Sequence, residues 1–488
     1  MAYKHGTYGE YMESISTIPL NSDTNIVYVG TAPINLVRGW KDKNLVNFPV
    51  EISSDSARTA VGYSDDWETF TLGEVIDLHY NNEVQTAGPI TVINVLNPDV
   101  HKKAQATTTE LNFVNDYARI SGDKIILDTL ALADMAEGVD YEVAYDTAAK
   151  ETVLHKLDTE KPATVNATYS EVDVSNINAS TIVGNVTEDG DRTGLDVLYL
   201  VYQELGTITN LLAAPGWSDN KDVYNKMLQV SQKMNGHWDC MVLADIPIAN
   251  TDTKEKAIKW KSDNGYTSEW SKVCWPMWKT NSGKIYHLSA VTAWEMMCVD
   301  SEHDGIPMET PSNKIIPSGK QYFGETSKNK GYDQVSANEL NENGITTAVY
   351  WAGYNVLWGG HTAAYEYGNV SDKRAIFDNS IRMMMYISNA FQEDNAAFID
   401  EPMTKALADT IKAREQEKMD ALVSVGALIG NPVVTFEPDD NKQGDLVEGN
   451  FVWRQKGTPT PPFKSGTLRI AYTDEGFSTY YEGEEGEG

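Results

Sequence analysis

The residues with the clearest chemical potential lie where two predicted strands of one βαβ unit end. Residues 211–214 and 239–247 are apolar runs typical of buried strands, and residues 221–234 between them are predicted to form a helix. Asp219 follows the first strand, and Asp245 lies near the end of the second. Because loops at the carboxyl ends of such strands often hold active sites, the two side chains could form a carboxylate pair.

The same loops lack the other groups of a hydrolytic site. Ser218 is not flanked by the glycine pair of a nucleophile elbow. No histidine adjoins Asp219 or Asp245 in the sequence, and whether His237 or His287 approaches them in space stays open. On these residues alone an enzymatic role stays open, for instance in a protein that binds or hydrolyses glycans.

Tryptophans give that alternative its best support. Seven of the twelve lie between Trp217 and Trp294, where they could form a sugar-binding platform. A large aromatic core is the commoner explanation of such a cluster.

Neither a metal nor a cofactor site is predicted. Residues 189–194 resemble the start of a calcium loop, but Leu200 stands where a bidentate glutamate is needed. Gly283 and Lys284 lack the other residues of a phosphate-binding loop. The three cysteines are few and widely spaced, which indicates buried thiols in a reducing cytosol: Cys240, Cys274 and Cys298.

Composition and charge limit the class of protein. The 488 residues suffice for two to four domains, and 41% of them are hydrophobic. We find no apolar run long enough to span a membrane and no signal peptide. The net charge of −32 argues against nucleic acid or an anionic membrane as a direct partner. It agrees with a very soluble protein, with salt-sensitive assembly, or with a basic partner.

The elements that position these residues alternate between strand and helix. Strands are predicted at 26–30, 47–52 and 89–96, with helices at 54–62, 72–83 and 195–205. Residues 101–190 differ, because short alternating runs at 124–127, 141–145 and 163–169 indicate an inserted all-β module.

The last part of the chain is predicted to be mainly helical. Helices from 372 to 391 and from 402 to 425 precede strands at 433–436 and 450–454. Residues 458–462 form a proline-rich linker, and residues 467–473 alternate like a strand beyond the core. Residues 474–488 carry six acids and no base. Residues 1–20 are either disordered or an arm that joins another chain's sheet.

Motifs along the whole chain resemble contractile tail sheath proteins. The helix pair followed by "GALIG" and a strand is similar to the C-terminal domain of that family. Further matches occur in order: "HGTYGE", "YVGTAP", "GPITVINVLNP", "APGWSD", "ADIP", "CWP", "TPSNK", "NGIT" and "NVLWGGHT". The loop after "GALIG" is shorter than in many relatives, and the acidic tail is extra.

The resemblance implies an α+β multidomain fold, with α/β core domains, an inserted β-sandwich domain and terminal strand-forming arms. The predicted parts are an N-terminal arm (1–20), an α/β domain in two pieces (21–100 and 191–362), the insert (101–190), a C-terminal sheath domain with the arm strand (363–473) and an acidic tail (474–488).

The resemblance also implies the function, which is structural and not enzymatic, with no catalytic residues. Such subunits polymerise as a helical cylinder around the tail tube and contract to drive the tube through a cell envelope. The implied partners are neighbouring sheath subunits, the tail tube protein, and baseplate and tail terminator proteins. The protein would be part of a virion or bacteriocin particle made in the bacterial host cytoplasm. The alternative becomes a particle-associated glycan-binding or glycan-hydrolysing protein.

Two sets of residues carry the implied contacts. A helix at 372–391 is expected to face the tube through Lys373, Arg374 and Arg382. The arm strands are expected to pair with neighbouring subunits through Tyr8, Glu10, Leu468, Arg469, Ile470 and Tyr472.

Overall fold

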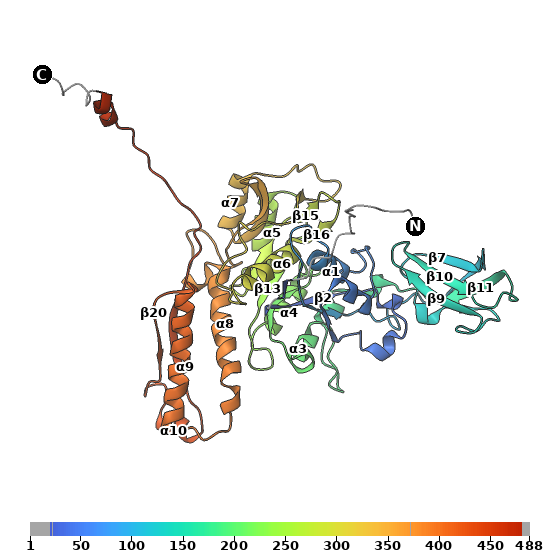
Figure 1. Ribbon diagram of the computed structural model, residues 1–488, viewed down its shortest axis with the longest axis horizontal. Coiled ribbons are helices and arrows are strands. Elements are labelled where there is room, and N and C mark those ends of the chain that lie inside the picture. The colour runs from blue at the N-terminus through green and yellow to red at the C-terminus, as the bar shows by residue number, and fades with distance from the viewer. Residues whose placement is uncertain (1–19, 22, 371, 481–488) are drawn as a thin grey trace, which may run out of the picture.

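The computed structural model describes residues 20–21, 23–370 and 372–480 (Figure 1). Its centre is an eight-stranded sheet in the order β19-β18-β14-β13-β12-β2-β5-β3. The six inner strands run parallel, and the two edge strands are antiparallel to their neighbours. The strands are β2 (Asn25–Gly30), β3 (Pro49–Ile52), β5 (Ile90–Asn94), β12 (Thr209–Ala213), β13 (Met241–Asp245), β14 (Ser271–Cys274), β18 (Ile345–Trp351) and β19 (Tyr354–Trp358).

Apolar runs explain the inner strands. Every residue of β5 and of β13 is buried, as expected for parallel strands covered on both faces. The strands predicted in this part are confirmed to within a few residues at their ends. The order of strands reverses beside β2, because β5 lies on one side of it and β12 on the other. The carboxyl ends of β2 and β12 therefore border a position where α/β folds often bind ligands.

Helices pack around this sheet. Helix α6 is buried from Leu288 to Asp300, and it contacts α1 and several inner strands. The predicted helix at 54–62 is a 3₁₀ helix. The α-helices of this part are α1 (Leu72–Tyr80), α2 (Ala179–Val183), α3 (Leu198–Leu205), α4 (Lys221–Val230), α5 (Lys254–Asn264), α6 (Leu288–Ser301) and α7 (Gln334–Glu342). The 3₁₀ helices are Ile34–Leu36, Trp40–Lys43, Asp55–Ala60, Leu127–Thr129, Val174–Asn176, Gly194–Val197, Lys373–Ala375, Ala396–Phe398 and Glu475–Tyr480.

Two small sheets complete the α/β body. The first pairs β1 (Leu20–Asn21) with β4 (Ala87–Gly88) in parallel. The second is antiparallel and consists of β15 (Met277–Thr280), β16 (Ile285–Tyr286) and β17 (Gly319–Tyr322), with β15 in the middle. Figure 1 shows the β15 and β16 strands near α7, at the end of the body opposite the turn that joins α8 (Asp378–Asp394) to α9 (Lys405–Ser424).

The segment between β5 and α2 forms two three-stranded antiparallel sheets, ordered β7-β10-β9 and β6-β11-β8. Their strands are β6 (Thr107–Asn112), β7 (Tyr117–Ser121), β8 (Ala131–Leu132), β9 (Tyr141–Asp146), β10 (Glu151–Lys156) and β11 (Thr164–Tyr169). Both sheets contribute to one separate apolar cluster, and they project from the body (Figure 1). The predicted strands at 141–145 and 163–169 are confirmed, whereas the one at 124–127 is wrong, because only one isolated bridge, at Ile125, forms there. Val172, Ile177 and Ile182 pack into the main core instead.

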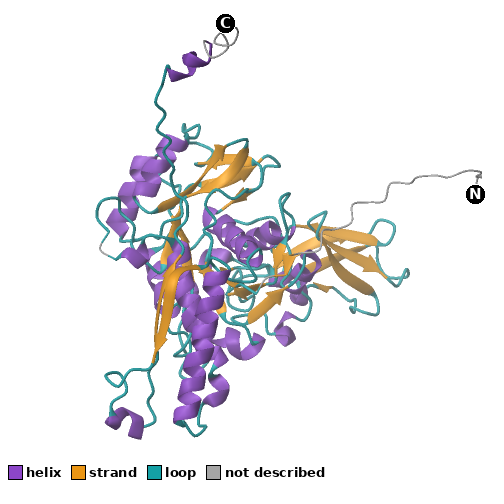
Figure 2. Ribbon diagram, turned by 60° about the vertical axis from the view of Figure 1, so that its left-hand side comes forward, coloured by secondary structure: helices purple, strands orange, loops and turns teal. Residues whose placement is uncertain are grey.

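The C-terminal part is a helical hairpin beside a two-stranded ribbon (Figure 2). Its elements are α8 (Asp378–Asp394), α9 (Lys405–Ser424), β20 (Leu428–Thr435), α10 (Gln443–Val447) and β21 (Arg454–Pro459). Met383 of α8, Met419 and Leu422 of α9, and Leu428 and Val434 of β20 form a cluster of their own. The predicted boundaries differ here: the first helix starts at Asp378, not at 372, and the second strand lies at Arg454–Pro459, not at 450–454.

Beyond Lys464 the chain leaves the body. Thr460 still donates its N–H to the Ala427 carbonyl at 3.0 Å, and Lys464 Nζ lies 3.4 Å from the Tyr365 hydroxyl. All residues from 463 to 480 are exposed, and residues 460–473 belong to no sheet. Figure 1 shows this segment extending away to the end marked C.

Candidate functional site

The cluster suggested by the sequence does form at the carboxyl edge of the sheet, with His287 rather than His237. Asp245 accepts hydrogen bonds from the main-chain N–H of Ser289 at 2.9 Å and from Ser289 Oγ at 2.5 Å. Ser218 Oγ donates to Asp245 at 3.4 Å and accepts from the Asp245 N–H at 3.0 Å. Ser218 is fully buried, so it joins the ends of β12 and β13 and is not an exposed nucleophile.

His287 is held as a cation. Its Nδ1 donates to Glu74 Oε2 at 2.8 Å, and its main-chain N–H donates to the other oxygen of Glu74. Burial opposes the charge of the imidazole, but Glu74, Asp245 and Asp219 raise the pKa of His287 to about 9. A group protonated at neutral pH is a poor general base.

Burial raises the pKa of Asp245 and of Asp219. The side chains of Asp219, Asp245 and His287 line a cavity of about 160 Å³ with Gly216, Ile246, Pro247, Ile248, Ala249 and Met277. The geometry fits a structural junction of β12, β13, α1 and α6 better than a hydrolytic site.

Across residues 20–21, 23–370 and 372–480, no group of three or more His, Cys, Asp or Glu side chains is arranged to hold a metal ion. No helix in the described part of the chain is long and apolar enough to cross a bilayer. All three cysteines are buried and free: Cys240, Cys274 and Cys298.

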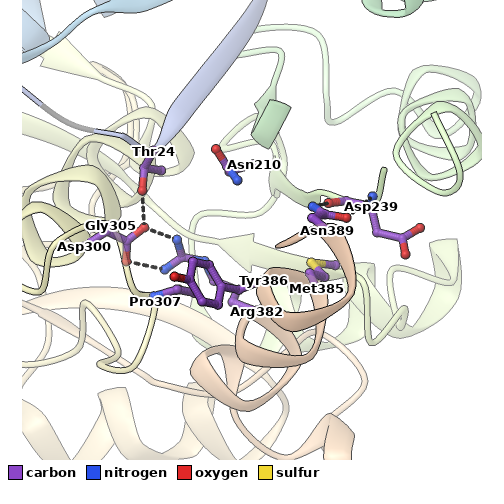
Figure 3. Close-up of a pocket in the computed structure, with 10 residues that line it drawn as sticks. All are labelled: Thr24, Asn210, Asp239, Asp300, Gly305, Pro307, Arg382, Met385, Tyr386 and Asn389. Carbon is purple, nitrogen blue, oxygen red and sulfur yellow. Dashed lines mark hydrogen bonds and ion pairs between the residues drawn. The ribbon is translucent and has the colours of Figure 1, made fainter. Parts of the chain in front are cut away.

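A second site, which we call the polar joint, attaches α8 to the α/β body. It consists of Thr24, Asp239, Asp300, Arg382 and Asn389, which line a common pocket (Figure 3). Arg382 donates two hydrogen bonds to Asp300, one of them at 3.0 Å to Oδ1. Thr24 Oγ1 donates to Asp300 Oδ2 at 2.8 Å. Asp300 thus links Thr24, which lies directly before β2, to Arg382 of α8.

Asn389 makes the other half of the joint. Its side-chain oxygen accepts from the Asp239 N–H at 3.1 Å, and its Nδ2 donates to the Asp239 carbonyl at 2.9 Å. Burial raises the pKa of Asp300, and the Arg382 guanidinium opposes that rise. The side chains of Arg382 and Asp300 both lie in the interior, because these residues are only 4% and 0% exposed.

A further buried ion pair lies one helical turn before Arg382. Lys272 of β14 and Asp378 of α8 are fully buried, with Nζ 2.6 Å from Oδ2. Lys272 also donates to the carbonyl of Gly359 at 2.7 Å, and Thr310 Oγ1 donates to Asp378 at 3.0 Å. Directional polar bonds at Asp378, Arg382 and Asn389 therefore fix how α8 lies on the body.

The predicted contact residues are separated by the structure. Lys373 and Arg374 are exposed and lie in a 3₁₀ helix before α8, where Arg374 pairs with Asp372. The prediction for Arg382 needs correction: its side chain is buried against Asp300 and cannot reach a partner from there.

Of the predicted arm residues, Tyr8 and Glu10 lie outside the described residues. The side chains of Leu468, Ile470 and Tyr472 are 81%, 84% and 84% exposed, and Arg469 is also exposed.

The sequence analysis missed Lys272, Asp300, Asp378 and Asn389 as structural contacts. The available signal was a set of polar residues at helical spacing, Asp378, Arg382 and Asn389, within the methionine-rich helix.

No family model matches the sequence. The chain is 25% identical over 486 residues to the tail sheath protein of Burkholderia phage BcepMu, covering 95% of this chain and 97% of the relative. Its sequence homologues are tail sheath proteins, including that of Escherichia phage P2.

Solved structures share the fold. A chain in the anti-feeding prophage (AFP) baseplate structure superposes with a TM-score of 0.58 at 13% identity, covering 97% of this chain and 100% of that chain. A chain of the extracellular contractile injection system PVC sheath complex in the contracted state gives 0.54 at 11% identity, with the same coverage. Nothing in these comparisons supports the glycan-binding or glycan-hydrolysing alternative.

Proposed function

We propose that the chain is a non-enzymatic structural subunit of a contractile tail sheath. It polymerises as a helical cylinder around a tail tube and contracts to drive the tube through the target cell envelope. The similarity to a tail sheath protein over 95% of the chain carries this proposal. The particle is a phage virion or a bacteriocin, assembled in the bacterial host cytoplasm.

The partners follow from this role. They are neighbouring sheath subunits, the tail tube protein, the baseplate and a tail terminator protein. The similar chain in the AFP baseplate structure supports the baseplate contact. No cofactor, nucleic acid or membrane takes part.

We divide the chain as the sequence suggested, with one change. The two sheets with their own apolar cluster form a β-sandwich domain. Because Val172, Ile177 and Ile182 pack into the main core, we end this domain near residue 170 rather than 190. The other parts are the arm at 1–20, the α/β domain, the C-terminal domain from 363 to 473 and the tail at 474–488.

Contraction requires subunits that move as rigid bodies, so that changes occur only between them. The polar joint and the Lys272–Asp378 pair support this, because buried directional bonds tie the C-terminal unit to the body. The exposed cations Lys373 and Arg374 remain our candidates for tube contact.

The two termini supply links between subunits. The extended segment with apolar residues at every second position, Leu468, Ile470 and Tyr472, has no partner strand among the described residues. In the same part of the chain, β20 and β21 pair only with each other, so each has one edge open to strand addition. Each added hydrogen bond contributes only ~1 kcal/mol net, so the strength of the mesh comes from repetition.

The test is assembly of three chains: wild type, a truncation before Gly466, and Ile470→Pro, with Ile470→Val as the matched control. Proline removes one main-chain donor from the arm, whereas valine keeps the donor and the β-branched side chain. By electron microscopy and sedimentation velocity, wild type and Ile470→Val should form hollow cylinders, and the other two should stay monomeric. Their thermal melts should match wild type, because residues 463–480 are exposed.

Wild-type chains that remain dispersed under every assembly condition would contradict the sheath function. Cylinders formed as readily by the truncated chain would remove the arm from the mechanism while leaving the sheath role intact.

A further inference from the structure

The sheet of β15, β16 and β17 carries an unusual concentration of positive charge for this chain. The two segments that build it, residues 277–287 and 310–332, contain six lysines and a single acid, Glu325, in a protein of net charge −32. Three of these lysines, Lys320, Lys328 and Lys330, form what we call the lysine patch.

Strand pairing brings like charges together here. Lys279 of β15 lies directly opposite Lys320 of β17, an arrangement that is unfavourable unless an anion is near. Glu325 is that anion for Lys279, at 3.1 Å. Hydrogen bonds from Lys279 and Tyr322 lower the pKa of Glu325, and the charge of Lys320 adds to this.

The loop that carries the other two lysines is held beside β17. The N–H of Tyr332 donates to the Gln321 side chain at 2.8 Å. Asn329, which lies between Lys328 and Lys330, donates through Nδ2 to the carbonyl of Asp252 at 2.7 Å. The two lysines therefore flank an anchored residue.

Ion pairing accounts for only half of the lysines. Lys279, Lys284 and Lys314 pair with Glu325, Asp77 and Glu309. Lys320, Lys328 and Lys330 are exposed, and none forms an ion pair with a described residue. An excess of positive charge on a firmly held surface favours a partner of opposite sign.

We propose that the lysine patch binds the acidic tail, residues 474–488, of a second copy of this chain. The tail carries six acids and no base: Asp474, Glu475, Glu482, Glu484, Glu485 and Glu487. All residues from 463 to 480 are exposed, so the segment before the tail holds the start of the tail away from its own body (Figure 1). The inference rests on the proposed function, because a second copy is held close only in a polymer. Pairs of exposed charges are individually weak, so binding depends on several pairs and on tethering.

The binding test uses the chain truncated before Gly466, which lacks both the arm and its own tail, so that neither competes and the body stays monomeric. A fluorescent peptide of residues 474–488 should bind saturably at low salt and be released at about 0.5 M salt, where screening is strong. The variant Lys320→Glu/Lys328→Glu/Lys330→Glu should bind at least about tenfold more weakly.

The matched control is Lys221→Glu/Lys412→Glu/Lys442→Glu, which changes three other exposed lysines that form no ion pair with a described residue and alters the net charge equally. It should retain most of the affinity. Equal losses in the two triple variants, or no binding at low salt, would overturn the proposal.

A second measurement identifies the copy that supplies the tail. Cylinders assembled from a mixture of ¹⁴N and ¹⁵N wild-type chains are treated with a zero-length carbodiimide cross-linker. Cross-links from the tail acids to Lys320, Lys328 or Lys330 should include mixed-isotope pairs. Links found only within one chain would overturn the proposal, and because cylinders are present, this outcome would leave the sheath function standing.

Discussion

At the residue scale, Glu295 is the buried ionisable group with the clearest consequence for stability. It lies in the middle of α6 and is only 6% exposed. Burial raises the pKa of Glu295 to about 8, with Glu302 adding to the rise and Lys314 opposing it. At neutral pH the folded protein therefore holds this carboxyl mainly in its protonated form.

The change Glu295→Gln should remove a pH dependence of stability. From pH 4.5, the ordinary value, to about 8, the folded state holds more protons on Glu295 than the unfolded state does. Stability is thus lost as the pH rises through this window, by up to ~1.4 kcal/mol per pH unit. At pH 4.5 the wild type and Glu295→Gln should melt at nearly the same temperature. As the pH rises to 9, the wild type should melt at progressively lower temperatures than the amide variant. His287 titrates in both proteins, so its effect cancels in the comparison. A difference in melting temperature that stays constant with pH would refute the assignment of this pH dependence to Glu295.

We expect Arg382 to stabilise the folded chain and not to contact a partner protein. The change Arg382→Met keeps most of the side-chain volume but leaves Asp300 buried without its cation, which costs ~3–5 kcal/mol. Urea unfolding should show this loss, and adding Asp300→Asn should recover part of it. Arg374→Met, at an exposed pair, should cost less than ~1 kcal/mol. Similar losses for the two arginines would contradict the polar joint.

At the scale of elements, the sequence pattern locates those whose cause is local. Residues 241–245 are a continuous apolar run, and β13 follows from it. The start of α8 does not follow in this way. Asp372 does cap a turn, accepting from the Arg374 N–H at 2.9 Å, but that turn is a 3₁₀ helix. The α-helix begins six residues later at Asp378, where the pair with Lys272 lies.

Tertiary pairing also decided where β21 forms. Alternating residues at 450–454 predicted a strand, yet the strand is Arg454–Pro459. Thr458 and Pro459, predicted as part of a linker, lie opposite Ile429 and Leu428. A period-2 pattern does not specify which residues find a partner strand.

Charge reversal before α8 tests the tube contact. In Lys373→Glu/Arg374→Glu, the loss of both candidate contact cations should weaken assembly on purified tubes, while the monomer melt stays within a few degrees of wild type. Lys43→Glu/Lys221→Glu gives the same change in net charge at exposed sites away from this segment. Co-sedimentation with tubes compares the two pairs. Normal sheathing by the first pair would count against the contact.

At the scale of the whole molecule, the insert should be removable. The N–H of Lys103 bonds to the carbonyl of Glu171 at 2.9 Å, so the two ends of the insert are already adjacent. Replacing residues 104–170 with a short Gly/Ser linker should leave a folded chain that still forms thinner cylinders. Some stability should be lost, because buried Ile126 packs in the main core and contributes ~2 kcal/mol. Electron microscopy checks the result; a folded deletion that never polymerises would place the insert in the lattice.

The fold class of the chain could be predicted from the order of its motifs, whereas the side-chain contacts between distant residues could not. The motif order pointed to the correct class of fold because it samples the whole chain. Arg382 and Asp300 are separated by 82 residues, and Lys272 and Asp378 by 106. No periodicity links positions so far apart, so the sequence predicts a surface contact at Arg382 and not its buried partner. A polar residue on an apolar helix indicates a partner but does not identify it.

The free C-terminal segment poses a solubility problem for each newly made subunit. An exposed run with Leu468, Ile470 and Tyr472 on one side is the type of sequence that nucleates non-specific β-aggregation. The acidic residues that follow it directly act as gatekeepers, because like charges keep such segments apart in free subunits. Removing those charges should therefore cause amorphous precipitation before ordered growth. The same charges that set the partner of the tail would thus also protect the pool of unassembled protein.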